Sequence, residues 1–280
     1  MNRGPLLLLV ASLGVAAGCG GDDSAGSADS ANPPAVSASD SETASATSET
    51  IEPSGSTPVI DPGDGGNYTV VIEPDDFSSV VDNPFFPLAP GAVWQYDETH
   101  ADGETQTDTV EVLDQQRTVM GVDTIVVHDV AKDADGTTVE DTYDWYAQDS
   151  AGNVWYFGED TTSYDEGQSS TEGSWEAGVA GALPGIVMLA DPTVSDIGYR
   201  QEYLAGVAED MGQVIAGSGS ITVPFGTFDD IIRTRDWSPI EPDIVEEKVY
   251  ASGIGVVHEE TLSPADEHEE VVLTSFTPPA

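Results

Sequence analysis

The sequence predicts an all-β protein, an antiparallel meander that forms a curved sheet, a half-barrel or a barrel, behind a disordered N-terminal stalk. From residue 69 onward, runs rich in Val, Ile and aromatic residues alternate with turn residues about every eight to twelve positions, a spacing typical of antiparallel strands. No long amphipathic pattern is evident in this region. Residues 20–67 contain no aromatic side chain and few large aliphatic ones. This segment therefore has too little apolar area to fold.

The first segment, residues 1–18, is a predicted secretory signal peptide. Arg3 supplies a positive charge, Leu6 to Val15 form an apolar run, and Ala16 to Gly18 are the small residues before a cleavage site. The alternative is a membrane-spanning helix, which needs about 20 apolar residues. Since the run reaches only about half that length, we expect export and cleavage.

Cys19 follows directly and is a predicted lipidation site. Val15-Ala16-Ala17-Gly18-Cys19 resembles the lipobox of bacterial lipoproteins, although Ala16 stands where that family most often has leucine. The resemblance implies acylation of the Cys19 sulfur and attachment to a cell membrane or outer membrane, with the domain outside the cytoplasm. Cys19 is the only cysteine of the chain, so it forms no intramolecular disulfide and no multi-cysteine metal site. Plain secretion is the alternative.

Residues 19–68 are the predicted lipidated N-terminus and a disordered acidic linker rich in Ser, Ala and Pro. Low hydrophobicity combined with negative charge is typical of disorder. A coil of about 50 residues spans roughly 40 Å, which would hold a domain clear of the membrane. Glycosylation is an alternative role for this segment, because Asn67-Tyr68-Thr69 fits an N-glycan acceptor.

Residues 69–280 form a single predicted all-β domain. Its first hairpin joins Trp94–His100 to Thr105–Val119 across Asp102-Gly103, and Asp-Gly between two alternating runs is a strong hairpin signal. Further strands are expected at 124–130, 138–147, 154–159, 199–204, 213–223, 228–237, 246–251, 255–262 and 269–276. Residues 175–192 are too irregular for a strand and are expected to cover the barrel mouth. Closure would remove exposed sheet edges.

Charge excludes one class of partner. The chain carries 52 Asp and Glu against 7 Lys and Arg, for a net charge of −45, and its two lysines are Lys132 and Lys248. Nucleic-acid binding needs a basic face that releases counterions from phosphates, and docking on anionic lipid needs similar basic clusters. We therefore expect no nucleic acid. The acidity is typical of saline habitats, where salt screens self-repulsion, and acidic wall proteins are the alternative.

The chain carries no evident catalytic or metal-binding motif, so we expect no enzyme, no cofactor and no metal. His258-Glu259-Glu260 and His268-Glu269-Glu270 lack the second histidine that a zinc-protease helix places four residues after the first. Gly217-Ser218-Gly219 does not fit a serine-hydrolase elbow. In Asp133-Ala134-Asp135-Gly136 the glycine comes fourth, as in a hairpin turn, and not sixth, as in a calcium-binding EF-hand loop.

The candidate ligand-binding residues are Trp145, Trp155, Trp175, Arg200 and Glu202. The three tryptophans would line or close an apolar cavity, as a carrier of small hydrophobic molecules requires. Arg200 and Glu202 lie on a predicted strand in a chain with few cations, where Arg200 could face a ligand. The alternatives are core positions for the tryptophans and a structural ion pair for Arg200.

Several segments resemble a family of uncharacterised exported bacterial lipoproteins. Asp82-Asn83-Pro84-Phe85-Phe86-Pro87-Leu88, followed by Pro90-Gly91 and Trp94, is similar to the opening of their all-β domain. Segments 144–149, 152–159, 173–178 and 199–203 agree as well, so the resemblance covers essentially the whole domain. More loosely, 223–228 is similar to a turn and strand of half-barrel envelope lipoproteins, some of which carry acyl chains. The family implies no established activity.

Two classes of function follow from these features. The first is a membrane-anchored binding module for a small apolar or lipid ligand. The alternative is a surface structural or interaction domain without a ligand cavity, and a secreted hydrolase is third. A hollow interior would separate the first two, but the alternation of residues along strands does not decide it. Oligomeric state is not predicted.

Overall fold

The computed structural model describes residues 68–165, 167–265 and 268–279. The predicted signal peptide, Cys19 and the linker up to residue 67 lie outside the described residues. The prediction of an all-β fold is confirmed, because the described helical structure is one short 3-10 turn, η1 (Pro74–Asp76). The described part of the chain contains no helix long and apolar enough to cross a bilayer.

Nine long strands and nine short ones make up the described fold. The long strands are β2 (Val93–Thr99), β3 (Thr105–Val119), β4 (Val122–Asp133), β5 (Thr138–Asp149), β6 (Val154–Asp165), β15 (Ile231–Ser238), β16 (Glu241–Ala251), β17 (Gly255–Ser263) and β18 (Glu270–Thr277). The short strands are β1 (Phe77–Ser78), β7 (Gln168–Ser170), β8 (Trp175–Glu176), β9 (Leu183–Met188), β10 (Tyr199–Arg200), β11 (Glu202–Tyr203), β12 (Met211–Ala216), β13 (Ile221–Val223) and β14 (Gly226–Phe228).

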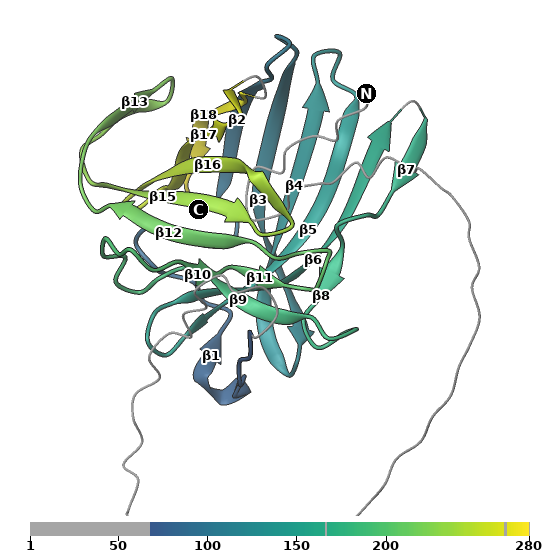
Figure 1. Cartoon of the computed structure of the whole chain (residues 1–280), viewed down its shortest axis with the longest axis vertical. Helices are drawn as coiled ribbons and strands as arrows, with labels where there is room; N and C mark the ends of the chain where they lie inside the picture. The colour runs from purple at the N-terminus through teal and green to yellow at the C-terminus, as the bar shows by residue number, and fades with distance from the viewer. Residues whose placement is uncertain (1–67, 166, 266–267, 280) are drawn as a thin grey trace, which may run out of the picture.

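The strands pair as the predicted antiparallel meander. β2 to β6 are neighbours in chain order, β15 to β18 form a second run, and β18 pairs with β2 to join the runs into one sheet. Figure 1 shows β2 to β6 side by side along one wall, with β12, β15 and β16 crossing in front of them. The sheet is therefore strongly curved and surrounds an interior.

The sheet is nearly closed into a barrel at Gln201. β10 forms one end of the sheet and β11 the other, and only Gln201 separates these two strands in the chain. At Gly185 in β9, an added Cβ would lie 2.3 Å from the carbonyl carbon of Gln201. Only glycine leaves room for the Gln201 backbone to come this close to β9. Gly185 therefore allows the two ends of the sheet to meet.

Two sequence expectations are corrected here. Residues 175–192 do not cover a barrel mouth as an irregular loop, because β8 and β9 within them pair with β6 and add to the wall. β9 begins Leu183-Pro184-Gly185, and the Pro and Gly obscured a strand whose residues from Pro184 onward are all buried. The expected strand 213–223 is also divided, because β12 ends at Ala216 and β13 pairs with β14 in a separate hairpin.

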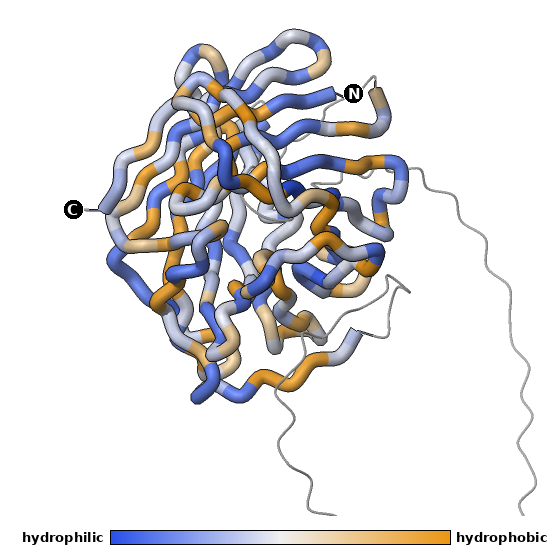
Figure 2. The backbone as a smooth tube through the Cα atoms, turned by 90° about the vertical axis from the view of Figure 1, so that its left-hand side faces the viewer, coloured by the Kyte–Doolittle hydropathy of each residue, from blue (hydrophilic) through white to orange (hydrophobic). Residues whose placement is uncertain are grey.

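The interior changes character from one end of the barrel to the other. On β2, the buried alternate residues are Trp94, Tyr96 and Glu98, and the residues between them are exposed. On β5, the inward row runs Glu140, Thr142, Asp144 and Tyr146, which lie in the opposite direction because the strands are antiparallel. In Figure 2, hydrophobic and hydrophilic residues interleave along the chain at short intervals.

Aromatic side chains fill one end of this interior. Phe86 lies 5.5 Å from Tyr146 and 6.4 Å from Tyr250, measured between ring centroids. Tyr146 stacks on Tyr156 at 5.0 Å, and Tyr156 meets Trp175 edge-on at 5.3 Å. These contacts connect β5, β6, β8 and β16 to the loop that precedes β2. The other end of the interior carries acids.

Candidate functional site

Four buried acids on three adjacent strands form the most unusual group of the interior, and we call them the β3–β5 acid cluster: Asp108, Asp129, Glu140 and Asp144. The strand register brings them together. Asp108 pairs with Ala131, which pairs with Glu140, and Asp129 pairs with Thr142 in the next row. Asp144 lies two residues beyond Thr142 and shares its face of β5.

Asp108 and Asp129 act as a coupled carboxyl pair. Burial raises the pKa of Asp129 well above its ordinary value, and the charge of Asp108 raises it further. Burial also raises the pKa of Asp108, which the hydrogen bond with Asp129 partly offsets. Two ionised carboxylates cannot bond to each other, since each only accepts hydrogen bonds. A hydrogen bond between the two groups therefore requires a proton on one of them.

Glu140 and Asp144 are shifted in the same direction. Burial, followed by the charges of Asp108 and Asp144, raises the pKa of Glu140 to about 8. Burial raises the pKa of Asp144 to about 7, although the hydrogen bond from Tyr156 lowers it. At pH 7 this end of the interior therefore takes up protons that isolated carboxyl groups would release.

The polar neighbours of this cluster are hydroxyl groups. No described Lys or Arg forms an ion pair with it. Tyr156 donates to Asp144 Oδ1 at 2.7 Å and contacts Glu159 Oε2 at 3.0 Å. The Tyr146 hydroxyl, fully buried beside Asp144, makes no hydrogen bond with a residue that the structure describes. Within residues 68–165, 167–265 and 268–279, no Lys or Arg forms an ion pair with a member of the cluster.

A second group of buried acids, on β15 to β17, surrounds a lysine, and we call it the Lys248 cluster: Lys248, Asp236, Glu246 and Glu259. Lys248 Nζ lies 3.5 Å from Glu259 Oε1 and 3.6 Å from Asp236 Oδ2. Burial disfavours its charge, but Glu259, Asp236 and Glu246 outweigh this and raise the pKa of Lys248 well above its ordinary value. Here a cation compensates acids inside the barrel.

Trp145 and Trp155, two of the predicted ligand-binding residues, do not face the interior acids. Tyr146 packs against Phe86 inside, and Trp145 points to the opposite face because neighbouring strand residues alternate. The Arg117 guanidinium lies 3.9 Å from the Trp145 ring centre. Trp155 donates its indole N–H to Asp149 at 2.8 Å and meets Phe77 edge-on. The N-terminal segment around β1 thus covers this outer face.

The other three predicted residues lie near the closure of the barrel. Glu202 is fully buried, and burial, followed by the charges of Asp210 and Glu159, raises its pKa well above the ordinary value, while the nearby Trp175 indole lowers it. Arg200, also buried, donates to the Glu209 carbonyl at 2.5 Å.

Arg200 also has an aromatic environment. Its guanidinium lies 5.2 Å from the Tyr203 ring centre and 5.9 Å from that of Tyr68. The structure therefore brings Trp175, Arg200 and Glu202 into one region and separates them from Trp145 and Trp155. Their role in ligand binding stays a prediction.

Sequence reasoning missed the β3–β5 acid cluster, although a signal was present. On the expected strand 138–147, Glu140, Thr142 and Asp144 alternate in phase with Tyr146, so acids and an aromatic residue share one face. In a chain with this many acids, a strand face that carries acids at alternate positions is normally interpreted as the face exposed to solvent. The closed sheet reverses that interpretation, because it places this face inside.

No protein-family profile and no curated protein matches the chain. Two solved structures are similar to it. One is a protein from Bacteroides fragilis described as exported with a YmcC-like fold, at 16% identity and a TM-score of 0.42, covering 69% of this chain and 99% of that one.

The second solved structure belongs to a protein from Parabacteroides distasonis described as a lipoprotein. It is 16% identical with a TM-score of 0.41, and the match covers 69% of this chain and 98% of that one.

Proposed function

We propose that this chain is a lipid-anchored, extracytoplasmic binding protein whose β domain holds a small amphiphile with a cationic group. The observation that carries the proposal is the β3–β5 acid cluster, four buried carboxyl groups with no described Lys or Arg in an ion pair with them. A ligand ammonium group would supply the charge that Lys248 supplies on the other side of the interior.

The chemistry of a buried carboxyl favours such a ligand. An isolated buried carboxylate is costly, so the group either stays protonated or pairs with a cation. The raised pKa values of Glu140 and Asp144, about 8 and about 7, mean that protons fulfil this role in the free protein. A bound ammonium would displace them, so binding should release protons and strengthen as pH rises.

The aromatic end of the interior supports an apolar portion on the same ligand. Tyr146 follows Asp144 by two residues on the inward face of β5, and its ring stacks on Tyr156. A short alkyl chain beside the ammonium would thus meet aromatic rings where the polar group meets acids. Attachment through Cys19 and a linker of about 40 Å would present this domain outside the membrane.

The alternative function, a surface structural or interaction domain, is favoured by one specific observation. The rings of Phe86, Tyr146, Tyr156 and Trp175 contact one another in series, as in a filled core. A hydrolase is the third candidate. The one observation that favours it is a pair of buried carboxyl groups, Asp144 and Glu159, that both contact the Tyr156 hydroxyl.

Isothermal titration calorimetry of the intact protein with hexylamine and with hexanoate tests the proposal. The two probes have the same chain length and opposite charge. We expect saturable hexylamine binding that strengthens between pH 6 and pH 8, with little or no binding of hexanoate. In Asp129→Asn/Glu140→Gln, the affinity for hexylamine should fall by about thirtyfold or more, since truncating a buried charge partner costs about 2 kcal/mol or more.

The control removes one acid from the exposed face of β3, as Glu111→Gln, and should leave hexylamine binding unchanged. Equal binding of hexanoate would remove the cationic group from the proposal and leave an apolar carrier. Binding of neither probe would contradict a ligand of this class and favour the surface interaction role.

A further inference from the structure

We propose that Glu98, His100 and Glu269 form a binding site for a divalent first-row transition ion at the end of the barrel where β2 and β18 meet. One ligand atom from each residue lies within 4.8 Å of the other two. This site shares no residue with the β3–β5 acid cluster, although Glu98 lies near enough to Asp108 and Glu140 for their charges to interact. It does not depend on the ligand proposed for that cluster. The sequence motifs predicted no metal, because no pair of histidines had metal-binding spacing.

The distances suit a metal centre. His100 Nε2 lies 3.3 Å from Glu98 Oε1, and His100 Nδ1 lies 3.0 Å from Glu269 Oε1. Metal bonds to nitrogen and oxygen are about 2.0–2.2 Å, so ligand atoms of one ion lie about 3–4 Å apart. A small rotation of the imidazole would therefore let one ring nitrogen and two carboxylate oxygens share an ion.

The backbone holds all three residues in place. Thr99 pairs with Glu270 and Glu98 pairs with Val271 across β2 and β18. The His100 N–H bonds to the Glu104 carbonyl at 2.9 Å, and the Thr261 N–H bonds to the Glu269 carbonyl at 2.9 Å. Because these bonds exist without a ligand, the site is preorganised and little conformational entropy opposes metal binding.

A buried oxygen of Glu98 faces this site without accepting a hydrogen bond from the described residues. Glu98 is 1% exposed, and its Oε1, the atom nearest His100, accepts no hydrogen bond from any residue that the structure describes. A buried carboxylate oxygen normally has a partner, and each exception calls for an explanation such as an ion. A metal ion would satisfy Glu98 Oε1 and compensate the charges of both glutamates.

The donor set indicates the class of ion. One imidazole nitrogen and two carboxylate oxygens suit Zn²⁺, Mn²⁺ or Co²⁺. Ca²⁺ takes six to eight oxygen ligands and is a poorer match. With three protein ligands, further coordination positions would stay open to water or to another molecule. The alternative without metal is a protonated imidazole that bridges two carboxylates.

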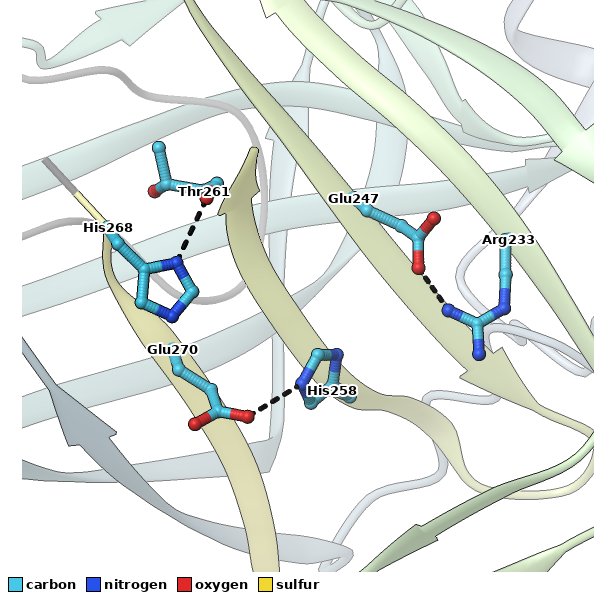
Figure 3. A network of polar contacts seen from close by, with 6 residues as sticks. All are labelled: Arg233, Glu247, His258, Thr261, His268 and Glu270. Atoms are coloured by element: carbon cyan, nitrogen blue, oxygen red, sulfur yellow. Dashed lines mark hydrogen bonds and ion pairs between the residues drawn. The ribbon is translucent and has the colours of Figure 1, made fainter. Parts of the chain in front are cut away.

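A matched control lies nearby, on β17 and β18. His258 Nε2 lies 3.1 Å from Glu270 Oε1, and Figure 3 shows this pair beside His268, which contacts the Thr261 carbonyl. His258 belongs to the face of β17 opposite Glu259, because neighbouring strand residues alternate. This pair offers one histidine and one glutamate, so it lacks the third ligand of the proposed site.

The test is calorimetric titration of the metal-stripped, intact protein with ZnCl₂, MnCl₂ and CaCl₂ at pH 7.5. We expect one saturable Zn²⁺ or Mn²⁺ site and weaker Ca²⁺ binding. His100→Gln and Glu269→Gln should each lower the affinity by more than about tenfold, since even outer partners of metal ligands carry effects of that size. His258→Gln should leave it unchanged.

A second readout covers variants that fail to fold. Co²⁺ added to the wild-type protein should give visible d–d absorption, and an equimolar addition of Zn²⁺ should bleach it. Absence of saturable Zn²⁺ or Mn²⁺ binding and of the Co²⁺ spectrum would overturn the proposal. An equal loss of affinity in His258→Gln would overturn it as well. Asp129→Asn/Glu140→Gln should retain metal binding, which separates this site from the amphiphile site.

Discussion

The two groups of buried acids inside the barrel differ in what compensates them. In the Lys248 cluster, an ammonium lies 3.5 and 3.6 Å from two carboxylates. In the β3–β5 acid cluster, the described neighbours are hydroxyl groups and other acids. Both groups are buried in one continuous sheet. A buried acid can thus be stabilised by an internal cation or by a proton, and only the second solution leaves the site open to a cationic ligand.

The largest predicted effect comes from removing the internal cation. Lys248→Met should lower the free energy of unfolding at pH 7 by about 3–5 kcal/mol, because it leaves Asp236 and Glu259 buried without their partner. Urea denaturation measures this change. Lys132→Met removes the other lysine, which is exposed, and should change stability by less than about 0.5 kcal/mol. Equal effects of both variants would remove the contrast between the two clusters.

A comparable effect of opposite sign is expected from neutralising an acid of the β3–β5 acid cluster, and it should appear only at high pH. The folded-state pKa of Glu140, about 8, lies above its ordinary value of 4.5. The folded state therefore binds the extra proton, and the stability it contributes at low pH is lost as pH rises through about 8.

Glu140→Gln should accordingly change stability little at pH 5 and stabilise the fold by about 3–5 kcal/mol at pH 9, since each pKa unit corresponds to about 1.4 kcal/mol. Denaturation curves from pH 5 to pH 9 measure this, with Glu111→Gln on the exposed face as control. A variant that is less stable than the wild type at pH 9 would mean that the Glu140 carboxylate is already compensated there.

The smallest effect concerns the hydroxyl that serves the β3–β5 acid cluster. Tyr156→Phe removes the donor to Asp144 Oδ1 and the contact with Glu159 Oε2. The cost at pH 6 should be about 1–1.5 kcal/mol, typical of a buried hydrogen bond. Tyr164→Phe, on the exposed end of the same strand, should cost nothing measurable. If Tyr156→Phe is also neutral, another donor must serve Asp144.

Local sequence signals predicted the elements more successfully than their inner and outer faces. The strand Thr105–Val119 was predicted with the observed bounds, because Asp-Gly and Gly turns mark both of its ends. β9 was missed, because its Pro184 and Gly185 are poor strand formers. These two residues lie against Gln201 and Glu202, where the sheet closes. Closure brings together residues far apart in the chain, so patterns over a few neighbouring residues do not predict it.

The predicted site residues show the same limit. Trp145 and Trp155 were grouped with Trp175 on side-chain type alone, but Trp145 and Tyr146 are consecutive and must face opposite sides of β5. Glu202 was singled out, while Asp108, Asp129, Glu140 and Asp144 were hidden among 52 acids. Their burial depends on which strands pair and how the sheet curves.

The sequence by itself determined the fold class and the order of the strands, because alternation and turn chemistry act over a few residues. The expectation that the chain binds no nucleic acid also rests on composition alone, because it is drawn from the net charge. Only the tertiary structure decided which face of each strand became the interior, and with it which carboxyl groups lost their solvent. That decision follows from closure at Gln201, where residues 16 positions apart in the chain, Gly185 and Gln201, come into contact. Burial then raised the pKa of these carboxyl groups above their ordinary values.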